Sequence, residues 1–156
     1  MKKLLALASF IFLFSAFQIN AQNRKAVGAA EVNGTFRSYF GGSYKGNYNE
    51  IKILSVGKGE LRVAFQLIYP HQDGKGELTA NMGEADGTAT IDGDTAVYTS
   101  EEYGKCTITI KFVKPGEIKV TQSGADSECG FGFNVTANGT YKKSSRAKPK
   151  FDTNQN

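Results

Sequence analysis

The feature that most constrains this fold is a strict two-residue alternation of apolar side chains, interrupted by glycine turns. Apolar residues recur at every second position in 60–69 (Leu61, Val63, Phe65, Leu67 and Tyr69) and in 106–113 (Cys106, Ile108, Ile110 and Phe112). This period is typical of a β-strand with one buried face. After the first 21 residues, no stretch of ten has apolar residues at a helical spacing. The chain is therefore predicted to be all-β.

The connections between the expected strands are short enough for a meander. Pro70 is expected to end the strand 60–69, which leaves 71–76 as an exposed loop. Hairpin-length connections favour a small antiparallel up-and-down β-barrel of about eight strands, and closure removes unpaired edges. A β-sandwich is the alternative. The remaining strands are expected at 34–40, 50–56, 78–82, 87–91, 95–99 and 117–122, with 131–137 and 140–143 as the last strand or a hairpin.

Two similar pentapeptides lie near the ends of the predicted domain. Residues 33–37 read Asn-Gly-Thr-Phe-Arg, and residues 138–142 read Asn-Gly-Thr-Tyr-Lys. Pairing between the first and last strands would close a barrel and would give both segments the same environment. A chance likeness over five residues is the alternative.

The N-terminus has the pattern of a secretory signal. Lys2 and Lys3 precede an apolar run that is too short to span a bilayer comfortably, and Ala21 is a small residue at a plausible cleavage point. An uncleaved membrane anchor is the alternative. We expect export to the periplasm or the medium, without a lipid anchor. The expected divisions are a signal peptide at 1–21, a flexible leader at 22–32, a β-barrel domain at 33–143 and a disordered basic tail at 144–156.

The two cysteines predict one disulfide. Cys106 and Cys129 are the only cysteines, and an even count in a small exported domain favours a bridge. A metal or redox pair would need closer spacing or nearby histidines, whereas the chain has a single histidine. No metal and no other cofactor is therefore expected.

The charge is distributed unevenly along the chain. The formal net charge is +4, but the signal contributes +2 and the tail from Lys142 contributes +4, which leaves residues 22–141 at about −2. The segment 77–128 contains ten acidic residues and only four lysines. The high isoelectric point therefore does not indicate a nucleic-acid groove, and an acidic side of the body would attract a cationic partner.

The residues offer little for catalysis. His71 lies in a polar segment after Pro70, and acidic pairs such as Glu84 and Asp86 lie in or beside predicted turns, where water keeps both carboxylates ionised. The sequence around 86–94 lacks the ligand order of a calcium loop. The protein is therefore not expected to be an enzyme.

Two segments are candidates for binding, and each has a structural alternative. Tyrosines among glycines in 39–48 are typical of recognition loops, although they could simply cover the barrel end. The segment 129–134 is held by the predicted disulfide, which would also bring 101–103 close to it. Its two phenylalanines would share a strand face and would equally suit the core. The candidate binding residues are Tyr39, Tyr44, Lys45, Tyr48, Glu101, Glu102, Tyr103, Phe131 and Phe133.

The cysteine pair and its strands carry a resemblance. In 106–112 (Cys-Thr-Ile-Thr-Ile-Lys-Phe), 118–122 (Ile-Lys-Val-Thr-Gln) and 129–141 (Cys-Gly-Phe-Gly-Phe-Asn-Val-Thr-Ala-Asn-Gly-Thr-Tyr), the chain resembles small exported bacterial β-barrel proteins of largely unknown role. In outline it is also similar to periplasmic lysozyme inhibitors. The resemblance covers about residues 84–143 and transfers no inhibitory residue. It implies a disulfide-bearing antiparallel barrel that binds a hydrolase.

Three functions follow as expectations. The first is an exported, non-catalytic binding protein with a protein partner, in its most specific form an inhibitor of a lysozyme-like hydrolase. The second is a lipocalin-like carrier of a small apolar ligand. The third is a structural module of the envelope. No nucleic-acid partner and no transmembrane segment are expected, and the sequence leaves the oligomeric state open.

Overall fold

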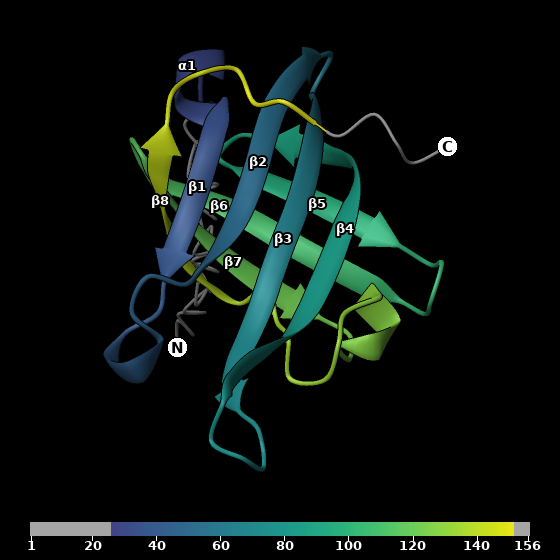
Figure 1. Ribbon diagram of the computed structural model, residues 1–156. Coiled ribbons are helices and arrows are strands. Elements are labelled where there is room, and N and C mark those ends of the chain that lie inside the picture. Colours follow the sequence, from purple (N-terminus) through teal and green to yellow (C-terminus); the bar gives the residue numbers. More distant parts are fainter. Residues whose placement is uncertain (1–25, 152–156) are drawn as a thin grey trace, which may run out of the picture.

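The computed structural model describes residues 26–151, and the predicted signal peptide and the start of the leader lie outside this range. Figure 1 shows eight strands wrapped around a common axis, with a short helix beside the first strand. The helical elements are α1 (Ala29–Val32), η1 (Gly42–Tyr44) and η2 (Ser127–Cys129). The strands are β1 (Gly34–Tyr39), β2 (Tyr48–Gly57), β3 (Glu60–Gln72), β4 (Leu78–Asp92), β5 (Thr95–Ser100), β6 (Cys106–Lys114), β7 (Glu117–Ser123) and β8 (Gly139–Ser145).

The strands form a closed antiparallel barrel in sequence order. Each strand pairs with the next along the chain, and β8 pairs with β1 through Phe36↔Lys143 and Arg37↔Lys142. The predicted up-and-down barrel is therefore confirmed, and the sandwich alternative is wrong.

The interior of the barrel is filled by the protein's own side chains. Alternation along β3 places Leu61, Val63, Phe65 and Leu67 inside, each no more than 1% exposed. Aromatic rings meet across the interior, with centroid distances of 6.4 Å for Phe36–Phe112 and 5.4 Å for Phe65–Tyr98. The other buried apolar residues of the barrel strands are Ile51, Ile53, Ala89, Ala96, Cys106, Ile108, Ile110, Ile118, Val120 and Tyr141.

The prediction that Pro70 ends β3 is wrong, because β3 continues to Gln72. The backbone N–H of Ile68 donates to Asn49 Oδ1 on the β2 side, at 2.7 Å. Pro70 lies two residues further along, so its missing N–H points to the same side, past the last paired residue of β2. Its pairing with Ala80 of β4 is unaffected, as expected for a proline at a strand edge.

The two short strands predicted at 78–82 and 87–91 form one strand, β4. Its inward positions carry small residues, and the glycines among them accommodate aromatic rings. A Cβ on Gly83 would lie 2.8 Å from the ring of Phe131, and one on Gly87 would lie 3.0 Å from the ring of Tyr98. These glycines therefore mark close packing in a continuous strand, not turns.

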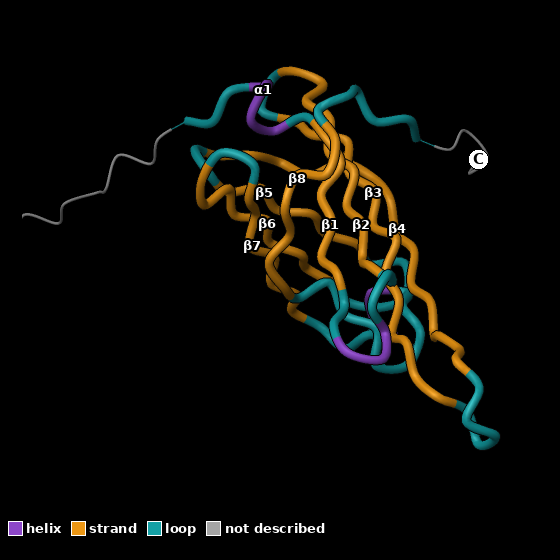
Figure 2. The backbone as a smooth tube through the Cα atoms, turned by 60° about the vertical axis from the view of Figure 1, so that its left-hand side comes forward, coloured by secondary structure: helices purple, strands orange, loops and turns teal. Residues whose placement is uncertain are grey.

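The β3–β4 hairpin extends well beyond the barrel. Figure 2 shows the two strands projecting as an arm past the neighbouring connections. We call residues 69–80 the arm; its two strands pair out to Gln72↔Leu78. At the tip, Asp73 Oδ1 accepts hydrogen bonds from the backbone N–H groups of Lys75 and Glu77. The arm therefore ends in a side-chain-supported turn.

The two similar pentapeptides occupy equivalent places. Asn33 Oδ1 accepts from Ser55 N at 2.6 Å, and Asn138 Oδ1 accepts from Gln122 N at 2.7 Å. Each asparagine thus ties the start of its strand to the neighbouring strand, and the glycine after each has a φ near 150°. The predicted strand at 131–137 is wrong, since only Phe131 makes an isolated bridge there.

Regular structure extends past both predicted boundaries of the barrel domain. In the leader, α1 forms and Val32 is buried. In the tail, β8 includes Ser144 and Ser145 because they lie beside β1. The segment then crosses the outer face of β1–β3 (Figure 1), where the Phe151 ring stacks 4.5 Å from the Arg62 guanidinium carbon. Regular structure therefore forms at 29–32, inside the expected flexible leader, and at 144–145, inside the expected disordered tail. Residues 152–156 of that tail lie outside the described range.

Candidate binding surface

The barrel topology gathers every predicted binding residue at one end. Because the strands alternate in direction, the connections β1–β2, β3–β4, β5–β6 and β7–β8 emerge together, and we call this the open end. In Figure 1 these connections follow the lower and right-hand rim of the barrel. All nine candidate residues lie in or next to them.

The first group surrounds the β1–β2 connection. The rings of Tyr39 and Tyr48 meet edge to face with centroids 5.5 Å apart. The Arg37 guanidinium lies 4.0 Å from the centre of the Tyr48 ring, and its Nε donates to Glu50 Oε2 at 2.6 Å. The hydrogen bond from Arg37 to Glu50 raises the pKa of Arg37. These contacts hold the Tyr48 ring in place, whereas Tyr39 remains 62% exposed.

Tyr44 and Lys45 lie apart from this pair, at the last residue of the short helix η1 and at the residue that follows it. The carbonyl of Tyr44 accepts hydrogen bonds from the backbone and side-chain nitrogens of Asn47, which closes the connection. Tyr44 is half-buried and Lys45 is exposed.

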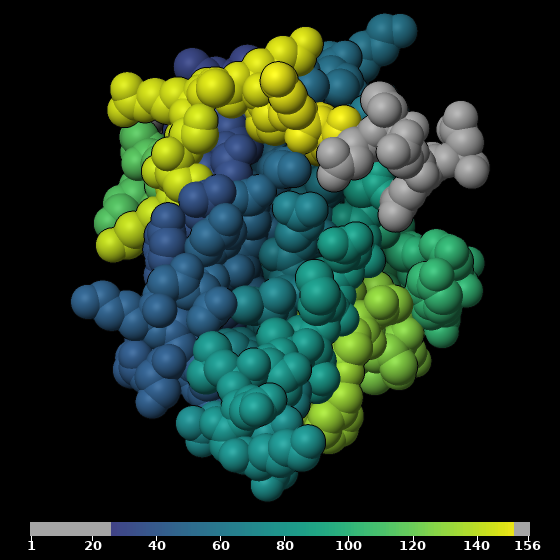
Figure 3. All heavy atoms as spheres, viewed as in Figure 1, coloured from purple at the N-terminus to yellow at the C-terminus, as the bar shows by residue number. Residues whose placement is uncertain are grey.

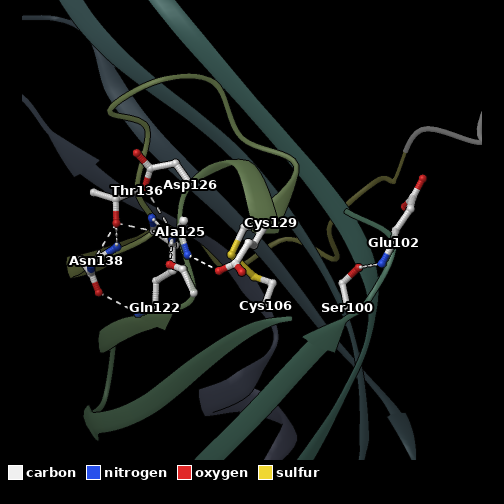
Figure 4. The surroundings of a disulfide bond; sticks show 12 residues. Ser100, Glu102, Cys106, Gln122, Ala125, Asp126, Cys129, Thr136 and Asn138 are labelled. Atoms are coloured by element: carbon white, nitrogen blue, oxygen red, sulfur yellow. Dashed lines mark hydrogen bonds between the residues drawn. A yellow bond between two sulfur atoms is a disulfide. The ribbon is translucent and has the colours of Figure 1, made fainter. Parts of the chain in front are cut away.

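The second group surrounds the disulfide. Cys106 at the start of β6 is bonded to Cys129 in η2, which confirms the predicted bridge (Figure 4). The Tyr103 ring lies against Gly130, where a Cβ would be 2.7 Å from a ring carbon. The bridge thus places the 101–103 turn beside the β7–β8 connection, as expected. Glu101, Glu102 and Tyr103 are exposed there.

The two phenylalanines have opposite environments, so the expectation that they share a strand face is wrong. Phe131 is 5% exposed and packs on Gly83, whereas Phe133 is 78% exposed. The backbone between η2 and β8 turns through left-handed conformations at Gly130 (φ 73°) and Asn134 (φ 63°), which breaks the alternation. Asn81 Nδ2 donates to the carbonyl of Phe133 at 2.7 Å and holds the exposed ring beside β4.

Two residues missed in the sequence join these groups. In the sheet register Ile68 pairs with Met82, and their side chains lie on the outer face of β3 and β4. Met82 is 63% exposed, and its carbonyl accepts the N–H of Gly132 next to Phe133. Both residues lie in predicted strands, 60–69 and 78–82, but the sequence did not show that these strands pair as one long hairpin. The resulting outer row, which we call the open-end strip, consists of Tyr39, Tyr48, Ile68, Met82 and Phe133.

A groove lies beside the open-end strip on the same outer face. It has a volume of about 280 Å³. The face formed by β1–β4 fills the front of Figure 3, below the C-terminal segment. The groove is lined by Arg37, Tyr48, Glu50, Gln66, Leu67, Ile68, Met82 and Glu84.

The acidic residues of 77–128 do not form one side of the protein, which corrects the sequence-based expectation. Asp92, Asp94 and Glu117 lie at the end opposite the arm, and the carboxylates of Asp94 and Glu117 approach Lys111 and Lys114. The open-end connections nevertheless carry six carboxylates against three lysines. These are Asp73, Glu77, Glu101, Glu102, Asp126 and Glu128 against Lys45, Lys75 and Lys105.

At the opposite end of the barrel, one lysine contacts the segment that contains α1. Lys143 Nζ donates to the carbonyls of Ala30, Glu31 and Asn33 at 3.1, 2.7 and 2.9 Å. Burial lowers the pKa of Lys143. A cleft of about 540 Å³ lies between α1, the β6–β7 turn and the start of the tail. Lys143 therefore fastens the leader helix to the barrel.

Comparison with protein-family models, with curated proteins and with solved structures finds no match. Within residues 26–151 no helix has the length and apolar character needed to cross a membrane. In the same range no three histidine, cysteine or acidic side chains are grouped in a way that could hold a metal ion. The geometry of the open end is thus what bears on function.

Proposed function

We propose that this protein is an exported, non-catalytic binding protein that contacts a protein partner through the open end of its barrel. One observation carries the proposal. Tyr39, Met82 and Phe133 are more than 60% exposed and lie along one row, on a barrel whose interior is filled. Exposed aromatic and methionine side chains on a rigid scaffold are typical of protein interfaces.

The filled interior weighs against the carrier alternative. A lipocalin-like protein holds its ligand inside the barrel. Here the inward positions of β3 and β6 are occupied by large apolar side chains, and aromatic pairs span the space between the walls. The exposed apolar surface is on the outside, where a macromolecule would meet it.

The arm supports the more specific form of the proposal, an inhibitor of a lysozyme-like hydrolase. An inhibitor of this kind needs a stiff projection that enters an open cleft, and the arm is a paired two-stranded ribbon with an ordered tip. Lysozymes are usually cationic, and the excess of carboxylates around the arm would steer such an enzyme to this end.

The test is a peptidoglycan lysis assay with a panel of lysozymes and the oxidised protein. We expect stoichiometric inhibition that weakens as salt rises, because the steering is electrostatic. An arm-shortened variant, in which residues 70–80 are replaced by Asn-Gly, keeps the pairs up to Ile68↔Met82 and is expected to lose inhibition. The matched control is Lys58→Gly, in the β2–β3 turn at the opposite end, which is expected to inhibit normally.

Two results would contradict the inhibitor form of the proposal, each in a different part. Absence of inhibition across the panel would remove the lysozyme-inhibitor form. Full inhibition by the arm-shortened variant would show that the arm is not the inserted element.

A further inference from the structure

The groove on the outer face has two rows of different chemistry. Glu50 pairs with Gln66 and Gln66 with Glu84 across three adjacent strands, so these polar side chains form one row. Ile68 and Met82 form the next row towards the open end, beside Tyr48. A ligand in this groove would meet polar groups along one side and apolar surface along the other.

The two carboxylates of the polar row differ in their partners. Glu50 is 7% exposed, and its Oε2 is paired with Arg37. Its other oxygen, Oε1, lies 4.0 Å from Lys52 Nζ. Glu84 is exposed, and among the ion pairs within residues 26–151 none involves it. The groove therefore holds one carboxylate whose charge is balanced and one whose charge is available to a ligand.

The apolar row suits the stem of a long basic side chain. Lysine and arginine bury their methylene groups along apolar surface and keep the charged group at a polar end. Met82 is 63% exposed and flexible enough to cover such a stem. The volume of about 280 Å³ lies just below the usual range for small-molecule pockets, which fits a single side chain better than a cofactor.

The polar row favours arginine over lysine. A guanidinium group presents five N–H donors in a plane and binds a carboxylate through two of them. In this groove the carboxylate of Glu84 and the amide oxygen of Gln66 lie on neighbouring strands in direct register. A single guanidinium can donate to both, whereas an ammonium group would act as a point charge.

We propose that this groove binds one arginine side chain of the partner protein, with the guanidinium on Glu84 and Gln66 and the stem along Ile68 and Met82. This inference rests on the proposed function, because it assumes a protein partner at the open end. It adds the chemistry by which that partner is recognised, a protruding arginine on a cationic surface. The contact lies beside the arm, so both would engage the partner at once.

The test uses N-acetylarginine amide as the probe in an NMR titration of the oxidised protein, with N-acetylcitrulline amide as the neutral probe of matched shape. We expect saturable shifts of the backbone amides of Gln66, Ile68 and Glu84 with the arginine probe alone. Glu84→Gln is expected to weaken binding about fivefold, the upper end for an exposed ion pair. The matched control is Glu60→Gln, an exposed glutamate of β3 outside the groove, which is expected to bind as the wild type does.

Three results would overturn the inference: equal shifts with the citrulline probe, undiminished binding by Glu84→Gln, or the same weakening by Glu60→Gln. The outcome is separable from the proposed function. Arginine binding without inhibition of any lysozyme would disprove the inhibitor proposal alone. Inhibition without arginine binding in the groove would disprove this inference alone.

Discussion

Removing the disulfide is expected to destabilise the whole barrel, and the size of the effect follows from the chain it encloses. Cys106 and Cys129 are 23 residues apart in sequence. Releasing a loop of this length gives the unfolded chain an entropy worth about 3 kcal/mol at 25 °C. For a domain of this size, that loss lowers the melting temperature by roughly 10 °C.

The assay is equilibrium urea unfolding followed by circular dichroism, applied to Cys106→Ala, Cys129→Ala and the double variant. Either single change already opens the loop, so the double variant is expected to lose only slightly more free energy of unfolding than each single one. Wild-type protein with strong reductant is the control, and its midpoint should approach those of the variants. An unchanged urea midpoint, combined with new proteolytic cleavage in 124–138, would refute the reasoning, because the bridge would then restrain only the local connection.

Three further predictions address packing, anchoring and pH. Gly83→Ala forces Phe131 away and is expected to cost about 1–3 kcal/mol of unfolding free energy, whereas Gly74→Ala in the open arm tip should cost little; equal urea midpoints would contradict this. Lys143→Met removes the hydrogen bonds to the carbonyls of Ala30, Glu31 and Asn33 and is expected to cost about 1–3 kcal/mol of unfolding free energy. The comparison is the exposed neighbour Lys142→Met, and equal losses would show that these contacts add no stability. Burial raises the pKa of Tyr141 above its ordinary value of 10.0, so the unfolded chain ionises first and stability falls as pH rises above about 10. Tyr141→Phe should flatten this fall in urea midpoints measured from pH 8 to 11, and an unchanged slope would contradict the assignment.

The candidate site was only partly predictable. Tyr39 and Tyr48 were recognisable because tyrosines beside glycines at a strand connection are exposed in many folds. Ile68 and Met82 were each within a predicted strand, but the turn signals at Pro70 and Gly83 hid the continuous hairpin that pairs them. Whether a proline or glycine breaks a strand depends on which neighbour faces it, and that neighbour is distant in sequence.

The two phenylalanines near the second cysteine show the same limit. Their spacing of two predicts a shared face only if the backbone stays extended. The disulfide and the packing of Phe131 on Gly83 hold this segment in a turning path, so Phe133 faces the solvent. The local sequence does not predict this turning path, because the path depends on how the chain crosses from β7 to β8.

The sequence by itself determined the fold class, the inward faces of β3 and β6 and the pairing of the two cysteines. These follow from local alternation and from composition, since a strand with one apolar face must bury it and two cysteines allow one bridge. Only the tertiary structure decided the continuity of β4, the length of the arm, the anchoring of the leader by Lys143 and the groove around Glu84. Each of these depends on side chains that barrel closure brings together from separate strands, where packing and edge position outweigh local propensity.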